Sequence, residues 1–252
     1  MKHQAIHEPF YYTRGSKIGV LFIHGIFGSP NQFRPLANRL YNAGCDCKAI
    51  LLPGHGNNCK TFTTTNYKEW KKYAKSEIIY MKQKYEKVFV VGHSMGSLFS
   101  LDFADELGVN GVILLNLPIK IMIRPEQIKY CATIVLGNKK KYNQGKTRRN
   151  LLFSIEKGFW YEYILWVFPL LGVLHHMLST RLKLATIKVP VLLFQSKKDE
   201  VVHYKSIFRF KKIMKNDNLK LVMLKDAKHS YYPPHEEAII ERLVLKFIKK
   251  YK

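Results

Sequence analysis

Short segments that are apolar at every position recur along the chain and alternate with longer amphipathic segments. Strands that are apolar throughout belong in a sheet that is covered on both faces. Alternation with helices is typical of right-handed crossovers, so we expect an α/β fold with a mostly parallel sheet flanked by helices. The expected strands are residues 18–23, 48–52, 88–91, 111–115, 191–194 and 220–224, and the main expected helices are 31–43, 67–84, 95–106, 206–214 and 236–250.

An unusually long segment, residues 118–189, separates the fourth and fifth of these strands. A single helical crossover does not need so many residues. The segment begins apolar, continues through a basic stretch at 139–150 and becomes strongly aromatic and aliphatic from 153 to 178. We therefore expect a helical cap, residues 118–181, inserted after the fourth strand over the carboxyl edge of the sheet. The core would consist of residues 1–117 and 182–252.

Composition narrows the function classes. A hydrophobic fraction of 47% with 24% charged residues excludes disorder. The formal net charge of +24 suggests an anionic partner, but lysines spread along the whole chain favour a solvated basic surface, and we expect no nucleic-acid partner. No apolar stretch resembles a signal peptide or a complete membrane span, so a cytoplasmic protein is expected. Four cysteines without metal-ligand spacing predict reduced thiols and no metal site.

The strongest local motif is Gly92-His93-Ser94-Met95-Gly96, between an expected strand and an expected helix. Glycines two positions before and after a serine permit a sharp, strained turn that points the hydroxyl group away from the sheet edge. The helix that follows supplies free backbone N–H groups, which can stabilise negative charge. This turn predicts that Ser94 is a nucleophile.

A serine nucleophile needs a base that accepts its proton and an acid that orients the base. In this fold the acid and then the base follow at the ends of later strands. Asp199 follows strand 191–194 and is the expected acid, with Glu200 as the alternative, and His229 follows strand 220–224 and is the expected base. Other candidates lie in turns, in the loop of the histidine itself or at helix starts: Asp217, Asp226, His203 and His235.

A glycine-containing loop follows the first of these strands. Gly25 and Gly28 permit this loop to approach Ser94 closely. We expect the backbone N–H groups of Ile26 and Met95 to form an oxyanion hole. Two nearby histidines are expected to have structural roles: His24 and His55.

Together these motifs resemble the serine hydrolases of the α/β-hydrolase fold, and within them the small bacterial carboxylesterases and monoacylglycerol lipases. The resemblance spans nearly the whole chain and rests on residues 24–30, 53–56 and 92–96, the Asp199 loop and His229. It implies that Ser94, Asp199 and His229 form a catalytic triad, and that the insertion is a cap over an acyl pocket. The chain departs from the usual pattern of this family in two ways. Few residues precede residue 18, which shortens the hairpin that often opens this fold, and Ser97 stands after the serine motif where the family commonly has a second glycine.

The predicted function is hydrolysis of carboxylic esters with medium- to long-chain acyl groups through an acyl-serine intermediate, without a cofactor or a metal. Phe27, Trp160 and Trp166 are expected to contact the substrate. A thioesterase or amide hydrolase with the same triad remains open, as does a non-catalytic protein of this fold that binds a hydrophobic ligand. The apolar segment 159–178 either packs on the core or touches a lipid surface, with the basic run 139–149 favouring an anionic one.

Overall fold

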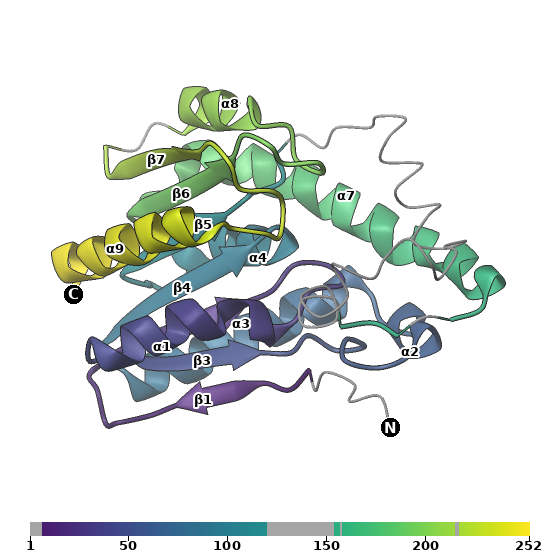
Figure 1. The fold of residues 1–252 in the computed structure, drawn as a ribbon, viewed down its shortest axis with the longest axis horizontal. Coiled ribbons are helices and arrows are strands. Elements are labelled where there is room, and N and C mark those ends of the chain that lie inside the picture. The colour runs from purple at the N-terminus through teal and green to yellow at the C-terminus, as the bar shows by residue number, and fades with distance from the viewer. Residues whose placement is uncertain (1–6, 120–153, 157, 215–216) are drawn as a thin grey trace.

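A seven-stranded sheet forms the centre of the structure (Figure 1). It is seen in a computed structural model that describes residues 7–119, 154–156, 158–214 and 217–252. The strand order is β1-β3-β2-β4-β5-β6-β7, and every neighbouring pair is parallel except β1 with β3. The strands are β1 (Phe10–Tyr12), β2 (Ile18–Ile23), β3 (Asp46–Ile50), β4 (Lys87–His93), β5 (Gly111–Leu115), β6 (Val191–Ser196) and β7 (Leu219–Leu224).

Helices cover both faces of this sheet. Successive residues of a strand point to opposite faces, so Leu21 of β2 lies in one apolar core and Phe22 in the other. One face packs on α1 (Arg34–Asn42) and α9 (Pro234–Tyr251). The opposite face packs on α3 (Tyr67–Lys84), α4 (Met95–Ala104), α7 (Val167–Lys183) and α8 (Ser206–Ile213). The predicted fold class is confirmed.

Short elements complete the chain, and one of them is an edge strand that the sequence did not reveal. The three residues of β1 pair antiparallel with β3, with Phe10 opposite Ala49. A segment of this length has too little periodicity to be recognised as a strand. The other short elements are η1 (Pro30–Phe33), α2 (Cys59–Thr63), η2 (Trp160–Trp166) and η3 (Leu184–Thr186).

The parallel register brings the carboxyl ends of six strands, β2 to β7, to one edge of the sheet. Ile23 of β2 lies opposite Gly92 of β4, and His93 lies opposite Leu115 of β5. Leu115 in turn pairs with Phe194 of β6. Loops that follow these strand ends therefore meet above the same edge, which is where ligands bind in open α/β sheets.

Most of the described part of the expected cap lies in an almost continuous helical segment, formed by η2, α7 and η3, which continues past residue 181. It is anchored to the core through Asp102 of α4, whose buried carboxylate pairs with Lys71 and accepts a hydrogen bond from Thr180 Oγ1 at 2.8 Å. Helix α7 extends past the expected boundary at residue 181, and residues 120–153 lie outside the described part of the chain. The division into cap and core stays a prediction.

This helical segment is also the most apolar in the structure. Among the described residues, Tyr161–Thr186 is the one helical stretch whose length and composition would let it cross a membrane. Only 28% of its most apolar 18 residues are buried. Its polar anchor on Asp102 ties it to the core of the protein. The cytoplasmic location expected from the sequence stays a prediction.

Candidate active site

Ser94 lies at the sharp turn between β4 and α4. Its backbone has a φ of 50°, a strained conformation for a residue with a side chain. The Ser94 N–H donates to the carbonyl of Leu115 at 2.9 Å, which fixes the turn to the end of β5. Neither flanking glycine leaves room for a side chain. A Cβ at Gly96 would lie 2.1 Å from the carbonyl oxygen of Ile23, and a Cβ at Gly92 would lie 2.6 Å from the carbonyl oxygen of Gly96.

Asp199 lies in the loop that follows β6, and its carboxylate is fully buried. Its Oδ1 atom accepts the backbone N–H groups of Val201 at 2.8 Å and Val202 at 2.7 Å. These bonds fix the carboxylate and compensate in part for its removal from water.

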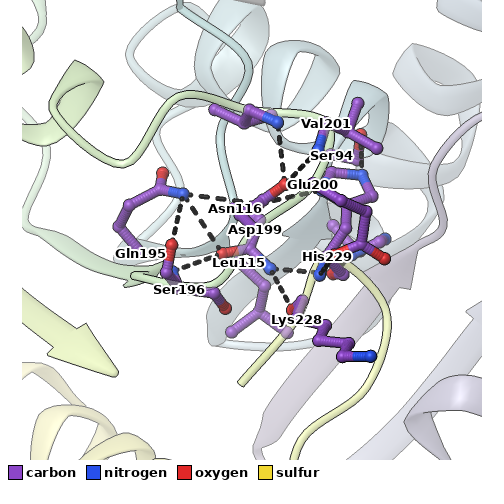
Figure 2. A network of polar contacts seen from close by, with 12 residues as sticks. Ser94, Leu115, Asn116, Gln195, Ser196, Asp199, Glu200, Val201, Lys228 and His229 are labelled. Atoms are coloured by element: carbon purple, nitrogen blue, oxygen red, sulfur yellow. Dashed lines mark hydrogen bonds and ion pairs between the residues drawn. The ribbon is translucent and has the colours of Figure 1, made fainter. Parts of the chain in front are cut away.

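His229, in the loop after β7, joins the serine to the aspartate (Figure 2). Its Nδ1 atom lies 2.9 Å from Asp199 Oδ2, and its Nε2 atom lies 3.0 Å from Ser94 Oγ. Burial lowers the pKa of His229, but the carboxylates of Asp199 and Glu200 outweigh burial and raise it above the ordinary value. The arrangement can therefore transfer a proton from Ser94 to an imidazole whose charged form is stabilised.

The backbone of His229 is held as firmly as its ring. Its N–H donates to Glu200 Oε2 at 3.1 Å. Its carbonyl oxygen lies 2.8 Å from Nδ2 of Asn116 and 2.8 Å from Nε2 of His93. Sequence reasoning missed Asn116 and gave His93 no separate role. The sequence offered one signal for these two residues, since His93 is a polar residue at the end of an apolar strand and Asn116 is a polar residue directly after one.

The glycine-containing loop after β2 packs directly against Ser94. A Cβ at Gly25 would lie 2.9 Å from Ser94 Cβ, so only glycine fits there. The N–H of Gly28 donates to the carbonyl of Gly25 at 2.9 Å and closes the loop. Within the described residues, the backbone N–H groups of Ile26 and Met95 donate no hydrogen bond to the protein. Both are therefore available to bind an oxyanion.

Aromatic side chains from the core and the cap meet beside this loop. The ring of Phe27 stacks on that of Trp166 with centroids 4.5 Å apart, and it contacts Phe62 at 5.1 Å. Phe27 itself has a φ of 59° and accepts the N–H of Ser154 at 2.9 Å. Two of the three expected substrate-contacting residues thus lie together next to the loop. The side chain of Trp160 lies outside the described part of the structure.

Comparison with known proteins agrees with this geometry. Residues 20–242 match the family model of the alpha/beta hydrolase family. The chain belongs to the alpha/beta hydrolase family. This hydrolase is similar to the thermostable monoacylglycerol lipase of Bacillus sp. (strain H-257), with 26% identity over 97% of this chain and 95% of the relative. It is 22% identical to the carboxylesterase of Bacillus subtilis (strain 168) over 96% of both chains.

Solved structures show the same fold. The structure of Paleococcus ferrophilus monoacylglycerol lipase matches this hydrolase with a TM-score of 0.70 and 19% identity, over 97% of this chain and 98% of that one. A structure from the metagenome-derived lipolytic enzymes LipS and LipT matches with a TM-score of 0.75 and 21% identity, with the same coverage. The resemblance expected from the sequence is confirmed at the level of family and fold.

Two further residues considered from the sequence make contacts outside the triad of this hydrolase. His24 is buried under the loop, where its Nε2 accepts the N–H of Leu52 at 3.0 Å. Asp226 pairs with Lys198 at 2.7 Å and with His235 at 3.4 Å. These contacts give each of them a structural role.

Glu236 was not considered from the sequence, although it is buried at the start of α9. Its two carboxylate oxygens accept the backbone N–H groups of Lys225, Asp226 and Ala227, three of the residues that precede His229. Glu236, Asp226 and His235 lie close enough to one another to suggest a cation site. Both oxygens of Glu236 are already engaged, however, so the cluster anchors the loop that carries His229.

Proposed function

We propose that this alpha/beta hydrolase cleaves carboxylic esters through an acyl-serine intermediate. The observation that carries the proposal is the continuous hydrogen-bonded chain from Ser94 Oγ to His229 Nε2, at 3.0 Å, and from His229 Nδ1 to Asp199 Oδ2, at 2.9 Å. The names of the two Bacillus relatives, a monoacylglycerol lipase and a carboxylesterase, support the ester as the bond that is cleaved.

The proposed reaction has two acyl-transfer steps. Ser94 Oγ attacks the ester carbonyl while His229 Nε2 accepts its proton, and the imidazolium is stabilised by Asp199. The backbone N–H groups of Ile26 and Met95 bind the oxyanion. Collapse expels the alcohol, which takes the proton from His229 and leaves the acyl group on Ser94. Water then attacks this ester while His229 accepts its proton, the bond between the acyl carbon and Ser94 Oγ breaks, and His229 returns the proton to Ser94 Oγ as the carboxylic acid leaves.

We propose acyl groups of medium to long chain length as the substrates. The aromatic side chains of Phe27, Phe62 and Trp166 pack together beside the loop that holds Ile26, with Phe62 and Trp166 buried and Phe27 half-buried. An alkyl chain bound against the accessible part of Phe27 would remove apolar area from water, at about 25 cal/mol per Å². Longer chains should therefore bind more tightly until no further apolar area is covered.

The test combines covalent labelling with a substrate panel. A fluorophosphonate probe should label the wild-type protein and leave Ser94→Ala unlabelled, which separates an enzyme from a protein that only binds hydrophobic ligands. A panel of p-nitrophenyl and glyceryl esters of graded chain length, with matched thioesters and amides, gives the acyl and bond preference. Absence of labelling, or a Ser94→Ala variant that keeps full ester hydrolysis, would refute the proposal.

We also propose that the outer face of η2 and α7 touches the lipid surface that holds such substrates. Ten large apolar side chains are exposed there, and a face of this kind on a helix is typical of interfacial contact. They are Tyr161, Ile164, Leu165, Val167, Phe168, Leu170, Leu171, Leu174, Leu178 and Leu182. The basic run 139–149 lies outside the described residues, so its place beside this face stays a prediction.

Vesicle binding tests this contact with a matched pair of variants. Phe168 on α7 is 68% exposed and Phe208 on α8 is 61% exposed. Phe168→Lys should reduce sedimentation with vesicles that contain phosphatidylglycerol, whereas Phe208→Lys should not. Failure of the wild-type protein to sediment with these vesicles, or equal effects of the two substitutions, would exclude lipid contact through this face.

A further inference from the structure

The carboxyl end of β5 lies between the three chain segments that carry Ser94, Asp199 and His229 (Figure 2). The carbonyl of Leu115 accepts the N–H of Ser94 at 2.9 Å. The N–H of the next residue, Asn116, donates to the carbonyl of Phe194 at 2.9 Å, in the strand that leads to Asp199. This strand end is therefore close enough to both later loops for a single side chain to reach them.

The side chain of Asn116 makes that connection. Its Nδ2 atom donates to the carbonyl oxygen of His229 at 2.8 Å, and the carbonyl of Lys228 and the hydroxyl of Tyr232 lie at 3.3 and 3.1 Å. Its Oδ1 atom accepts the N–H of Ser196 at 2.8 Å, at the start of the Asp199 loop. One buried amide thus joins the loop of the acid to the loop of the base.

The backbone conformation of Asn116 would suit glycine better than asparagine. The contacts of the side chain therefore explain why asparagine occupies this position. Its φ is 54°, in the left-handed region that glycine adopts freely and asparagine tolerates better than most residues. The residue is completely buried. Glycine would relieve the backbone strain here, but it would leave the N–H of Ser196 and the carbonyl of Lys228 without this partner.

We propose that Asn116 is a positioning residue that holds His229 in register with both Ser94 and Asp199. The inference rests on the proposed function, because it concerns proton transfer by His229. Asn116 acts on the backbone of His229 and is separated from the reacting atoms, so its loss should lower kcat and leave KM nearly unchanged. Misplacement of a catalytic group by about 1 Å can cost about 100-fold in rate.

The main test is Asn116→Gly, with Asn110→Gly as the matched control. Asn110 precedes the same strand at its opposite end, where its Oδ1 accepts the N–H of Val88 at 3.0 Å. With a soluble p-nitrophenyl ester, we expect Asn116→Gly to lower kcat about 10- to 100-fold at unchanged KM. Asn110→Gly should remove a comparable backbone contact and leave kcat within about two-fold of the wild type.

A second readout needs no substrate. The groups that face the His229 ring or its backbone and can carry charge are Asp199, Glu200 and His93, and the hydroxyl of Tyr232 contacts Asn116 itself. The raised pKa of His229 depends on close contact with Asp199, so Asn116→Gly should lower this pKa toward the ordinary value in an NMR titration. Asn110→Gly should leave it unchanged.

A third variant covers the case in which Asn116→Gly does not fold. Asn116→Asp keeps an acceptor for the N–H of Ser196 but replaces the amide donor to His229, and it should still lower kcat at least about ten-fold. Unchanged kcat and unchanged His229 pKa in a folded Asn116 variant would overturn the inference, as would equal effects from Asn110→Gly. If the wild-type protein hydrolyses no ester, the proposed function fails, and the NMR comparison still decides the role of Asn116.

Discussion

Asp199 and Glu200 are neighbours in the chain, yet they contact different parts of His229. The carboxylate of Asp199 lies 2.9 Å from the ring nitrogen Nδ1, whereas the carboxylate of Glu200 accepts the backbone N–H of His229 at 3.1 Å. Only Asp199 can fix the tautomer of the ring. The structure thus separates two acids that the sequence left as alternatives and gives each a distinct contact.

The first prediction uses this difference. Asp199→Asn should lower kcat about 10⁴-fold, because an amide that donates to Nδ1 selects the tautomer in which Nε2 cannot accept the serine proton. Glu200→Gln keeps an oxygen acceptor for the His229 N–H and should cost less than about ten-fold. Both are measured as kcat and KM on a soluble p-nitrophenyl ester. If Glu200→Gln is the more damaging change, Glu200 is the acid of the triad.

The second prediction concerns the pH dependence of kcat/KM. His229 must be neutral to accept a proton, so activity should fall as the pH drops through its pKa. Because Asp199 and Glu200 raise this pKa above the ordinary value despite burial, the acid limb should lie above about pH 6.5. Glu200→Gln removes one of the two carboxylates and should move the limb to lower pH. A limb that stays in place or moves upward would contradict this origin of the shift.

The strands that carry the site were predictable because the signal for each is local. The bounds of β2, α3 and β5 agree with those expected from apolar runs and helical spacing, and Ser94, Asp199 and His229 follow strands that were recognised in this way. Strand β1 was missed because three residues carry no clear period. Strand β3 begins at Asp46, two residues earlier than expected, where the carboxylate accepts the N–H groups of Arg14 and Ser16.

The residues that support the site were not predictable in the same way. Asn116 and His93 contact the carbonyl of His229 across more than a hundred positions of sequence. Glu236 holds a loop whose residues precede it, and nothing in its own helix distinguishes it from an ordinary acidic residue in a first turn. These contacts depend on the sheet register, which brings the strand ends together, and a local pattern carries no information about that register.

The third prediction tests the space around the nucleophile. A Cβ at Gly96 would lie 2.1 Å from the backbone oxygen of Ile23, which cannot move without disturbing β2, so Gly96→Ala should destabilise the fold by about 3 kcal/mol. Ser97 is also buried, but its hydroxyl donates to the carbonyl of Gly92 at 2.8 Å and fits the helix without crowding. Ser97→Gly should cost only about 1 kcal/mol. Urea unfolding gives both values, and equal losses would show that close packing does not select glycine at 96.

The last prediction is a loss of stability in mild acid that comes from buried imidazoles. Burial lowers the pKa of His55 to about 4, that of His93 to about 3 and that of His176 to about 4. An unfolded chain protonates these groups near pH 6.5, so their contribution to stability is complete above that pH and is lost as the pH falls toward 4. His229 has a raised pKa and therefore the opposite sign, since its contribution is lost as the pH rises.

His55 is the best single test, because its ring lies among His24, Phe62 and Trp70 and outside the triad. One such imidazole should contribute a slope of up to about 1.4 kcal/mol per pH unit between pH 6.5 and 4. Urea unfolding at several pH values should therefore show a shallower fall in the free energy of unfolding for His55→Gln than for the wild type. His235→Gln, which removes an imidazole that is 62% exposed, is the control for loss of a histidine as such. If the two variants have the same slope, burial of His55 is not a source of the acid sensitivity.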